Sequence, residues 1–221
     1  MDRPALKAAA KAQIKGNLGT IFVIVLLIGL LCCIPLFGFI LAPGLSISLC
    51  MIYLNLTKGQ SPEVGHMFSG TKVLGKAWWL QILTAFFVFL WSLLLFIPGI
   101  VKSYAYSMAP YVLADNPTFT AREALRESKR ITQGHKGQLF ILELSFFGWM
   151  LLQVLVTNGI GLAVGSMLGQ EHFMVSVASY VLSGVVSLIL FPYMQLTFAQ
   201  YYNYLTGWRS AESRDEYEIR F

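Results

Sequence analysis

A chain of 221 residues that is 56% hydrophobic and only 12% charged is far more apolar than a soluble protein, in which about a quarter of the residues are charged. The net charge of +5 comes from cationic residues gathered in clusters between long uncharged runs, which is typical of basic loops at the inner face of a membrane. The composition therefore predicts an all-α, polytopic membrane protein with no nucleic-acid partner. The three cysteines and three histidines have no metal-site spacing, so no cofactor is expected.

Six hydrophobic segments are candidates for membrane spans. One helix needs roughly 20 apolar residues to cross the hydrocarbon core, so the uncharged run from Leu18 to Leu56 has to contain two, with breaks at Pro35 and at the Ala-Pro-Gly of residues 42–44. The last run contains Pro192 and is interpreted as one kinked helix, with two separate spans as the alternative. The predicted fold is a transmembrane helical bundle of about six spans built as hairpins, in one integral membrane domain over residues 1–207, with spans near 18–36, 41–57, 77–97, 100–114, 137–156 and 173–205 and a cytoplasmic tail over 208–221.

Two amphipathic helices are predicted outside the spans. Residues 3–16 carry lysines every four residues on one face, which indicates a helix lying along the inner headgroups; a solvated basic tail is the alternative. Residues 120–133 form the second helix, because Thr120 and Glu123 have capping-box spacing and Gly134 is a natural stop. The cations on and beside this helix are a candidate cytoplasmic docking or anionic-lipid surface: Arg122, Arg126, Lys129, Arg130 and Lys136.

Glycine and proline residues indicate where the hairpins turn. Proline removes a backbone donor and disfavours helix at the residue before it, so the third and fourth segments are expected to end where such residues cluster. A glycine-rich segment over residues 158–169 has no lysine or arginine and is predicted to be an outer loop. The candidate helix-breaking residues are Pro98, Gly99, Asp115, Asn116 and Pro117.

The distribution of lysine and arginine predicts the orientation. Four precede the first span, three lie between spans two and three, five between spans four and five, and three in the tail, which is fifteen of the sixteen. Placing all fifteen at the cytoplasmic face requires an even number of spans with both termini inside. Six spans satisfy this condition, whereas seven would move the near-neutral tail outside.

Lys102 and Glu143 are ionisable residues inside hydrophobic segments, where charge is costly. Together with Tyr106 they form a candidate polar site for a proton or a substrate. The alternative is structural: Glu143 is satisfied by Lys136 or an interfacial arginine, and Lys102 extends to the outer surface. No nucleophile, metal cluster or phosphate-binding loop accompanies them, so the chain is not expected to be an enzyme.

Two short segments resemble one another, IYLNLTKG at residues 52–59 and YNYLTG at residues 202–207. Each ends a segment that starts soon after a proline, and residues 98–116 have the same layout. This pattern is typical of repeated hairpins, although tyrosine-leucine matches also arise by chance in membrane sequences.

The run over residues 89–152 contains IPGI, AYSMAPY, LADNP, the EAL and SK positions of the charged helix, and LSFFGW. With FPY and YYNYL near the end, it resembles the bacterial membrane family called domain of unknown function 975. That resemblance implies a multi-pass protein of the bacterial plasma membrane and transfers no catalytic residue. Two functions are expected on this basis: a non-enzymatic scaffold or accessory factor that docks a membrane-protein partner and contacts anionic headgroups, or a transporter of an ion, small molecule or lipid.

Overall fold

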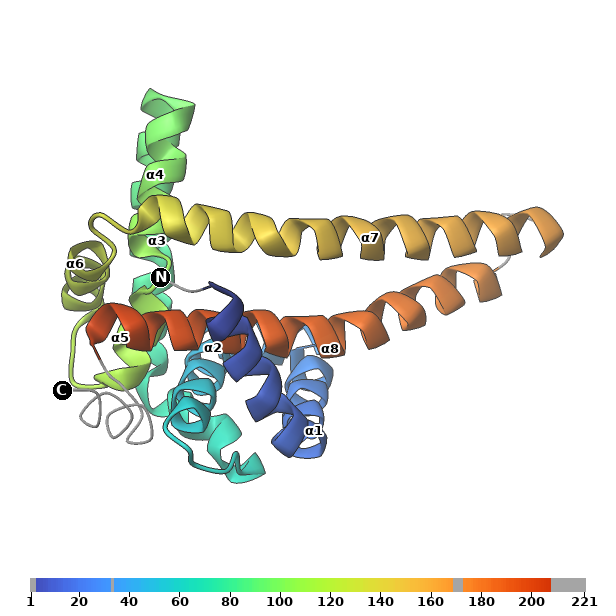
Figure 1. Cartoon of the computed structure of the whole chain (residues 1–221), viewed down its shortest axis with the longest axis horizontal. Coiled ribbons are helices and arrows are strands. Elements are labelled where there is room, and N and C mark those ends of the chain that lie inside the picture. Colours follow the sequence, from blue (N-terminus) through green and yellow to red (C-terminus); the bar gives the residue numbers. More distant parts are fainter. Residues whose placement is uncertain (1–2, 33, 169–172, 208–221) are drawn as a thin grey trace.

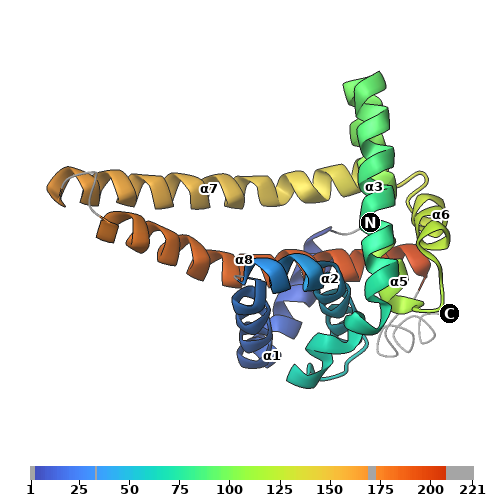
Figure 2. The same ribbon diagram turned by 180° about the vertical axis from the view of Figure 1, so that it is seen from behind.

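The computed structural model describes residues 3–32, 34–168 and 173–207, and every regular element in them is helical. The predicted cytoplasmic tail, residues 208–221, lies outside the described residues. Figures 1 and 2 show the arrangement from opposite sides. In chain order the elements are α1 (Arg3–Cys32), α2 (Pro35–Thr57), the 3-10 helix η1 (Val64–Val73), α3 (Leu74–Leu94), α4 (Phe96–Tyr106), α5 (Ala109–Asp115), α6 (Ala121–Ile131), α7 (Lys136–Leu168) and α8 (Phe173–Thr206).

The helices form two long hairpins joined by a packed centre. α7 and α8 run side by side and extend together away from the other helices, while α3 and α4 form a second hairpin that crosses them (Figures 1 and 2). α1 and α2 pack against the C-terminal half of α8, and the short helices α5 and α6 lie at the end of that half. The largest fully buried side chains cluster in this centre: Tyr53, Leu54, Met108, Leu113, Phe146 and Tyr201.

Four helical stretches in the described part of the chain are long and apolar enough to cross a membrane: Pro4–Cys32, Gly38–Thr57, Val64–Leu94 and Lys136–Gly159. The predicted amphipathic helix over residues 3–16 is continuous with the first of them, and Asn17 marks the junction with non-helical angles (φ −127°, ψ 20°). The predicted single helix over the last hydrophobic run is confirmed, since α8 continues through Pro192.

The predicted break at residues 42–44 is wrong. α1 ends at Cys32, Ile34 is extended, and α2 starts at Pro35, so Pro43 lies inside α2. Proline already has a helical φ, and its cost is one lost donor together with a steric kink. Such a proline is tolerated in membrane helices, where neighbouring helices re-satisfy the backbone; one turn before Pro43, the Trp78 indole of α3 donates to the Ile40 carbonyl oxygen at 2.9 Å.

Gly44 and Gly70 serve close packing between α2 and η1. A Cβ at Gly44 would lie 2.9 Å from Leu74 Cδ1 and 3.3 Å from Thr71 Cα. The Gly70 amide donates to Ser48 Oγ at 2.8 Å, and the Ser48 hydroxyl donates to the Gly44 carbonyl oxygen at 3.1 Å. This contact holds η1 against the middle of α2.

Pro98 and Gly99 do not form the break that was predicted there. The chain turns at Leu95, which is extended (φ −159°, ψ 134°), and both residues lie in the first turn of α4. Proline fits a first turn because the amide it lacks has no partner there. Gly99 instead allows the two helices to approach, since a Cβ would collide with Ser92 of α3.

The segment predicted as one helix over residues 100–114 is divided in two, because α4 ends at Tyr106 and α5 begins at Ala109. Pro110 in the first turn of α5 explains the separation. Asp115 is the last residue of α5, as its predicted role at a helix end requires, and Asn116 caps the helix with non-helical angles. Neither short helix is long enough to cross a membrane alone.

The glycine-rich segment is not an outer loop over most of its length. α7 continues through it to Leu168, the last residue described before the gap. Each glycine costs a helix only about 1 kcal/mol relative to alanine. The intervening apolar residues favour helix in a membrane, where backbone polar groups have to bond internally.

Candidate functional site

The charged helix α6 is organised as its sequence predicts. The Thr120 amide and hydroxyl both donate to Glu123 Oε2, at 2.7 and 2.8 Å, and the Glu123 amide donates back to Thr120 Oγ1. These bonds complete the predicted capping box and lower the pKa of the Glu123 carboxyl. The face of α6 that packs inward is fully buried and consists of Ala121, Ala124, Leu125, Ser128 and Ile131.

Hydrogen bonds fix α6 and the turn before it to the neighbouring helices α3 and α4. Near its C-terminus, the hydroxyls of Ser128 and Thr132 donate to the Ala105 carbonyl oxygen of α4, at 2.8 and 3.3 Å. Before its N-terminus, the Lys76 ammonium of α3 donates to the carbonyl oxygens of Pro117 and the residue after it, at 2.7 and 3.1 Å. The helix is therefore held as a rigid part of the bundle.

Four of the five predicted cationic residues lie on the outward side of this rigid helix, and the fifth is the first residue of α7. We call Arg122, Arg126, Lys129, Arg130 and Lys136 the basic surface. The first four are exposed, and Lys136 is half-buried at the start of α7. Arg130 forms an ion pair with Glu127, which lowers the pKa of that carboxyl. The remaining charges face solvent, so the surface presents net positive charge.

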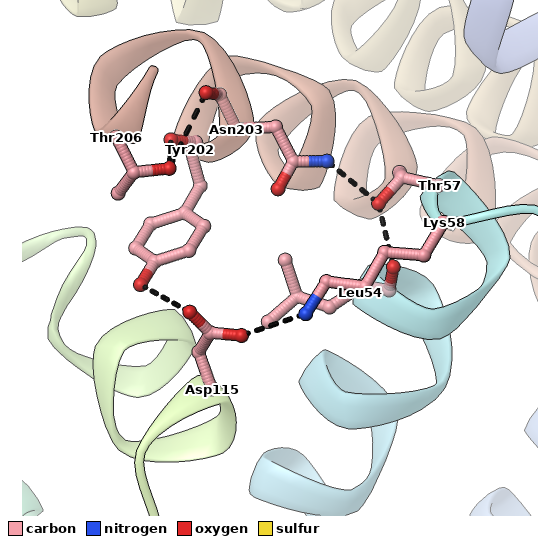
Figure 3. A network of polar contacts seen from close by, with 7 residues as sticks. All are labelled: Leu54, Thr57, Lys58, Asp115, Tyr202, Asn203 and Thr206. Atoms are coloured by element: carbon pink, nitrogen blue, oxygen red, sulfur yellow. Dashed lines mark hydrogen bonds and ion pairs between the residues drawn. The ribbon is translucent and has the colours of Figure 1, made fainter. Parts of the chain in front are cut away.

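A second polar cluster joins the ends of α2, α5 and α8 (Figure 3). Asp115 accepts from the Lys58 ammonium at 2.8 Å and from the Tyr202 hydroxyl at 3.2 Å. Asn203 Nδ2 donates to Thr57 Oγ1 at 2.7 Å, and both of these side chains are buried. We call these five residues the polar lock, because their contacts connect three segments that are far apart in the sequence.

A cavity of about 290 Å³ opens beside the polar lock. Lys58 and Asp115 line it together with Asn55, His66 and Ser69 from α2 and η1. His66 is exposed and 3.8 Å from Glu63. Within the described residues no group of three potential metal-binding side chains occurs. The lining of this cavity offers hydrogen-bonding groups.

The candidate polar site is only partly assembled. Glu143 of α7 accepts from the Tyr104 hydroxyl at 2.5 Å, rather than pairing with Lys102. The Lys102 ammonium lies 4.5 Å from the centre of the Trp91 ring, and Tyr106 packs against Phe87. The Tyr104 hydroxyl therefore connects α4 to Glu143 of α7.

Lys102 and Tyr106 lie in separate surroundings on α4. Tyr106 lines a separate groove of about 420 Å³ between α2, α3, α4 and α5, whose other polar members include Gln81 and Thr84.

The model of one protein family matches residues 93–209, more than half of the chain. That family is described as Protein of unknown function (DUF975). The chain belongs to this family. No curated protein and no solved structure matches it.

The DUF975 region extends from the end of α3 through α8. It contains the basic surface and three members of the polar lock, Asp115, Tyr202 and Asn203, while Thr57 and Lys58 lie outside it. Sequence reasoning did not find the polar lock as a site. The similarity between residues 52–59 and 202–207 was the available signal, because Thr57, Lys58, Tyr202 and Asn203 all come from those segments.

Proposed function

We propose that this DUF975 protein is a multi-pass plasma-membrane protein of a bacterium, with both termini in the cytoplasm, acting as a non-enzymatic scaffold or accessory factor. Four long apolar helices supply candidate spans. In this proposal α8 provides a fifth, and α4 with α5 completes a sixth by entering the membrane beside α3. The grouping of fifteen of sixteen basic residues at one face supports this orientation.

The single observation that carries the proposal is the construction of α6. α6 has a capping box, five buried positions and two hydroxyl bonds to one carbonyl oxygen of α4. A charged helix that served only to keep the protein soluble would need none of these features. These features hold the charged face of α6 in one position relative to α4. A preorganised surface binds with less loss of conformational entropy than a mobile segment, so we infer that it docks a membrane-protein partner and contacts anionic headgroups.

Crosslinking and pull-down from native membranes test the scaffold function. Replacing Arg126, Lys129 and Arg130 with glutamine should reduce recovery of a crosslinked partner at least tenfold, because the docking charges are removed. The matched control replaces Lys11, Lys15 and Lys72, which are exposed cations elsewhere, with glutamine. Equal recovery with both triple variants, or no partner with the natural chain, would contradict the proposal.

The second candidate function is transport, and the Tyr104–Glu143 hydrogen bond is what favours it. A carboxylate inside a hydrophobic segment is a candidate proton carrier. In proteoliposomes, Glu143→Gln should abolish proton-coupled uptake of the substrate. Uptake that is unchanged in this variant would exclude Glu143 from a transport mechanism.

A further inference from the structure

The polar connection after α2 turns back along that helix instead of leading away from it. Gly59 has a positive φ of 79°, a conformation that favours glycine, and it turns the chain just after Lys58. Further on, the Gly70 amide donates to Ser48 Oγ at 2.8 Å, which holds η1 against the middle of α2. The segment between Gly59 and Gly70 therefore forms a wall beside the last turns of α2.

The cavity of about 290 Å³ lies between this wall and the ends of α2 and α5. Small-molecule sites in proteins usually have volumes of about 300–1,000 Å³, so this cavity suits a small ligand. Its polar lining combines a cation, an anion, an amide, a hydroxyl and an imidazole, contributed by Lys58, Asp115, Asn55, Ser69 and His66.

Two of these polar side chains have hydrogen-bonding capacity that the described part of the chain does not use. Asn55 and Ser69 are half-buried, and among the described residues neither side chain has a hydrogen-bond partner. The amide supplies donors and an acceptor, and the hydroxyl supplies both as well. A ligand that bonds to them replaces water and breaks no contact within the protein.

Lys58 and Asp115 present opposite charges next to each other at the cavity (Figure 3). Their ammonium and carboxylate are 2.8 Å apart, and the two side chains are 30% and 31% exposed. The Tyr202 hydroxyl, 3.2 Å from the second oxygen of Asp115, holds that carboxylate in place. An ion pair this exposed contributes little to stability, so a ligand that brings an opposite charge to each partner can replace it.

The balance of charge indicates the class of ligand. One cation and one anion line the cavity, so a ligand with a single charge would be repelled by one of them while the other attracted it. An uncharged ligand would gain nothing from the pair. A zwitterion, which has both an ammonium group and an acidic group, offers an opposite charge to both side chains.

The other side of the cavity is apolar. Met51 and Leu54 line it from α2 and Ala114 lines it from α5. Met51, Leu54 and Asn55 have the spacing of one helical face, and Lys58 follows one turn later. Leu54 is buried whereas Lys58 is exposed, so the apolar end of the cavity is the inner one. A hydrocarbon side chain fits this end.

We propose that the cavity binds an aliphatic α-amino acid in its zwitterionic form. The ammonium group of the ligand donates to Asp115, and its carboxylate accepts from Lys58. Asn55 and Ser69 bond to the same polar groups, and the ligand side chain lies against Met51. The basic surface and the Tyr104–Glu143 pair take no part, so this site goes beyond the proposed function and does not depend on it.

Isothermal titration calorimetry of the detergent-purified full chain, with L-leucine as the probe, tests the site. L-Leucine should bind saturably. Its methyl ester lacks the carboxylate and N-acetyl-L-leucine lacks the ammonium group, so each should bind about tenfold more weakly, as expected for the loss of a charged hydrogen bond. Equal binding of the three compounds would overturn the proposal, as would no saturable binding of L-leucine. Binding of ethanolamine phosphate without binding of L-leucine would also overturn it, because the ligand would then be a lipid headgroup.

Two variants place the ligand in the cavity. Asn55→Ala and Ser69→Ala should each weaken L-leucine binding about fivefold, the usual effect of one uncharged hydrogen bond. Ser61→Ala is the matched control, because Ser61 is an exposed serine of the same connection that does not line the cavity. Equal affinity of the Ser69→Ala and Ser61→Ala variants, or unchanged affinity of Asn55→Ala, would overturn the site. The comparison of leucine with its two derivatives uses the natural chain, so it tests the proposal even where a variant does not fold.

Discussion

Gly70→Ala should destabilise the protein by about 3 kcal/mol, measured as a lowered thermal unfolding temperature in detergent. A Cβ at this position would collide with the Gly44 carbonyl oxygen and lie 2.5 Å from the Ser48 amide nitrogen. These are backbone atoms of α2, so the clash cannot be relieved by rotating a side chain. η1 would have to move away, and the bond from the Gly70 amide to Ser48 would be lost.

Gly65→Ala is the matched control for this prediction. Gly65 lies in the same 3-10 helix, and a Cβ there would meet nothing within 4 Å. Its unfolding temperature should stay close to that of the natural chain. If Gly70→Ala and Gly65→Ala unfold at the same temperature, the close packing of η1 on α2 is wrong.

Asp115→Ala should destabilise the protein by about 2 kcal/mol. The variant leaves the nearly buried Tyr202 hydroxyl without its charged acceptor and removes the Lys58 partner. Most of the expected loss comes from Tyr202, because the Lys58–Asp115 ion pair is about one-third exposed and solvent weakens it. The ends of α2, α5 and α8 should therefore loosen together.

The control for Asp115 is Glu63→Ala. Glu63 is 73% exposed, and its carboxylate is 3.8 Å from His66, so its removal should change the stability by less than about 0.5 kcal/mol. Hydrogen exchange should show faster exchange at the ends of all three helices in Asp115→Ala. Faster exchange confined to α5 would indicate that the polar lock does not connect them.

The charged helix was predictable because all its signals are local. The Thr120–Glu123 box and the spacing of Ala121, Ala124 and Leu125 act within one or two turns, and the structure has both. The membership of the DUF975 family was likewise carried by contiguous segments, and it is confirmed.

The breaks were less predictable because proline and glycine have more than one use. Pro43 is accommodated inside α2, and Gly44 and Gly99 allow helices to approach rather than turning the chain. Which use applies depends on the neighbouring helix, which composition does not reveal. The same reasoning applies to the glycine-rich end of α7.

The polar contacts depend on the tertiary fold. Lys58 and Asp115 are 57 positions apart, and Tyr202 is 87 positions from Asp115. The sequence identified Glu143 as costly in a membrane but not Tyr104 as its partner, because Tyr104 and Tyr106 of α4 were both candidates. The sequence indicates that the Glu143 carboxylate, in a hydrophobic segment, needs a polar partner. The packing of α4 on α7 determines that this partner is Tyr104.

The orientation of α6 is tested most directly by cysteine labelling. In a background with Cys32, Cys33 and Cys50 replaced, Arg126→Cys places a thiol on an exposed position of the basic surface. A membrane-impermeant maleimide should label it only after the cells are permeabilised, whereas Asn158→Cys, near the far end of α7, should be labelled in intact cells. Labelling of the cysteine at position 126 in intact cells would contradict a cytoplasmic basic surface.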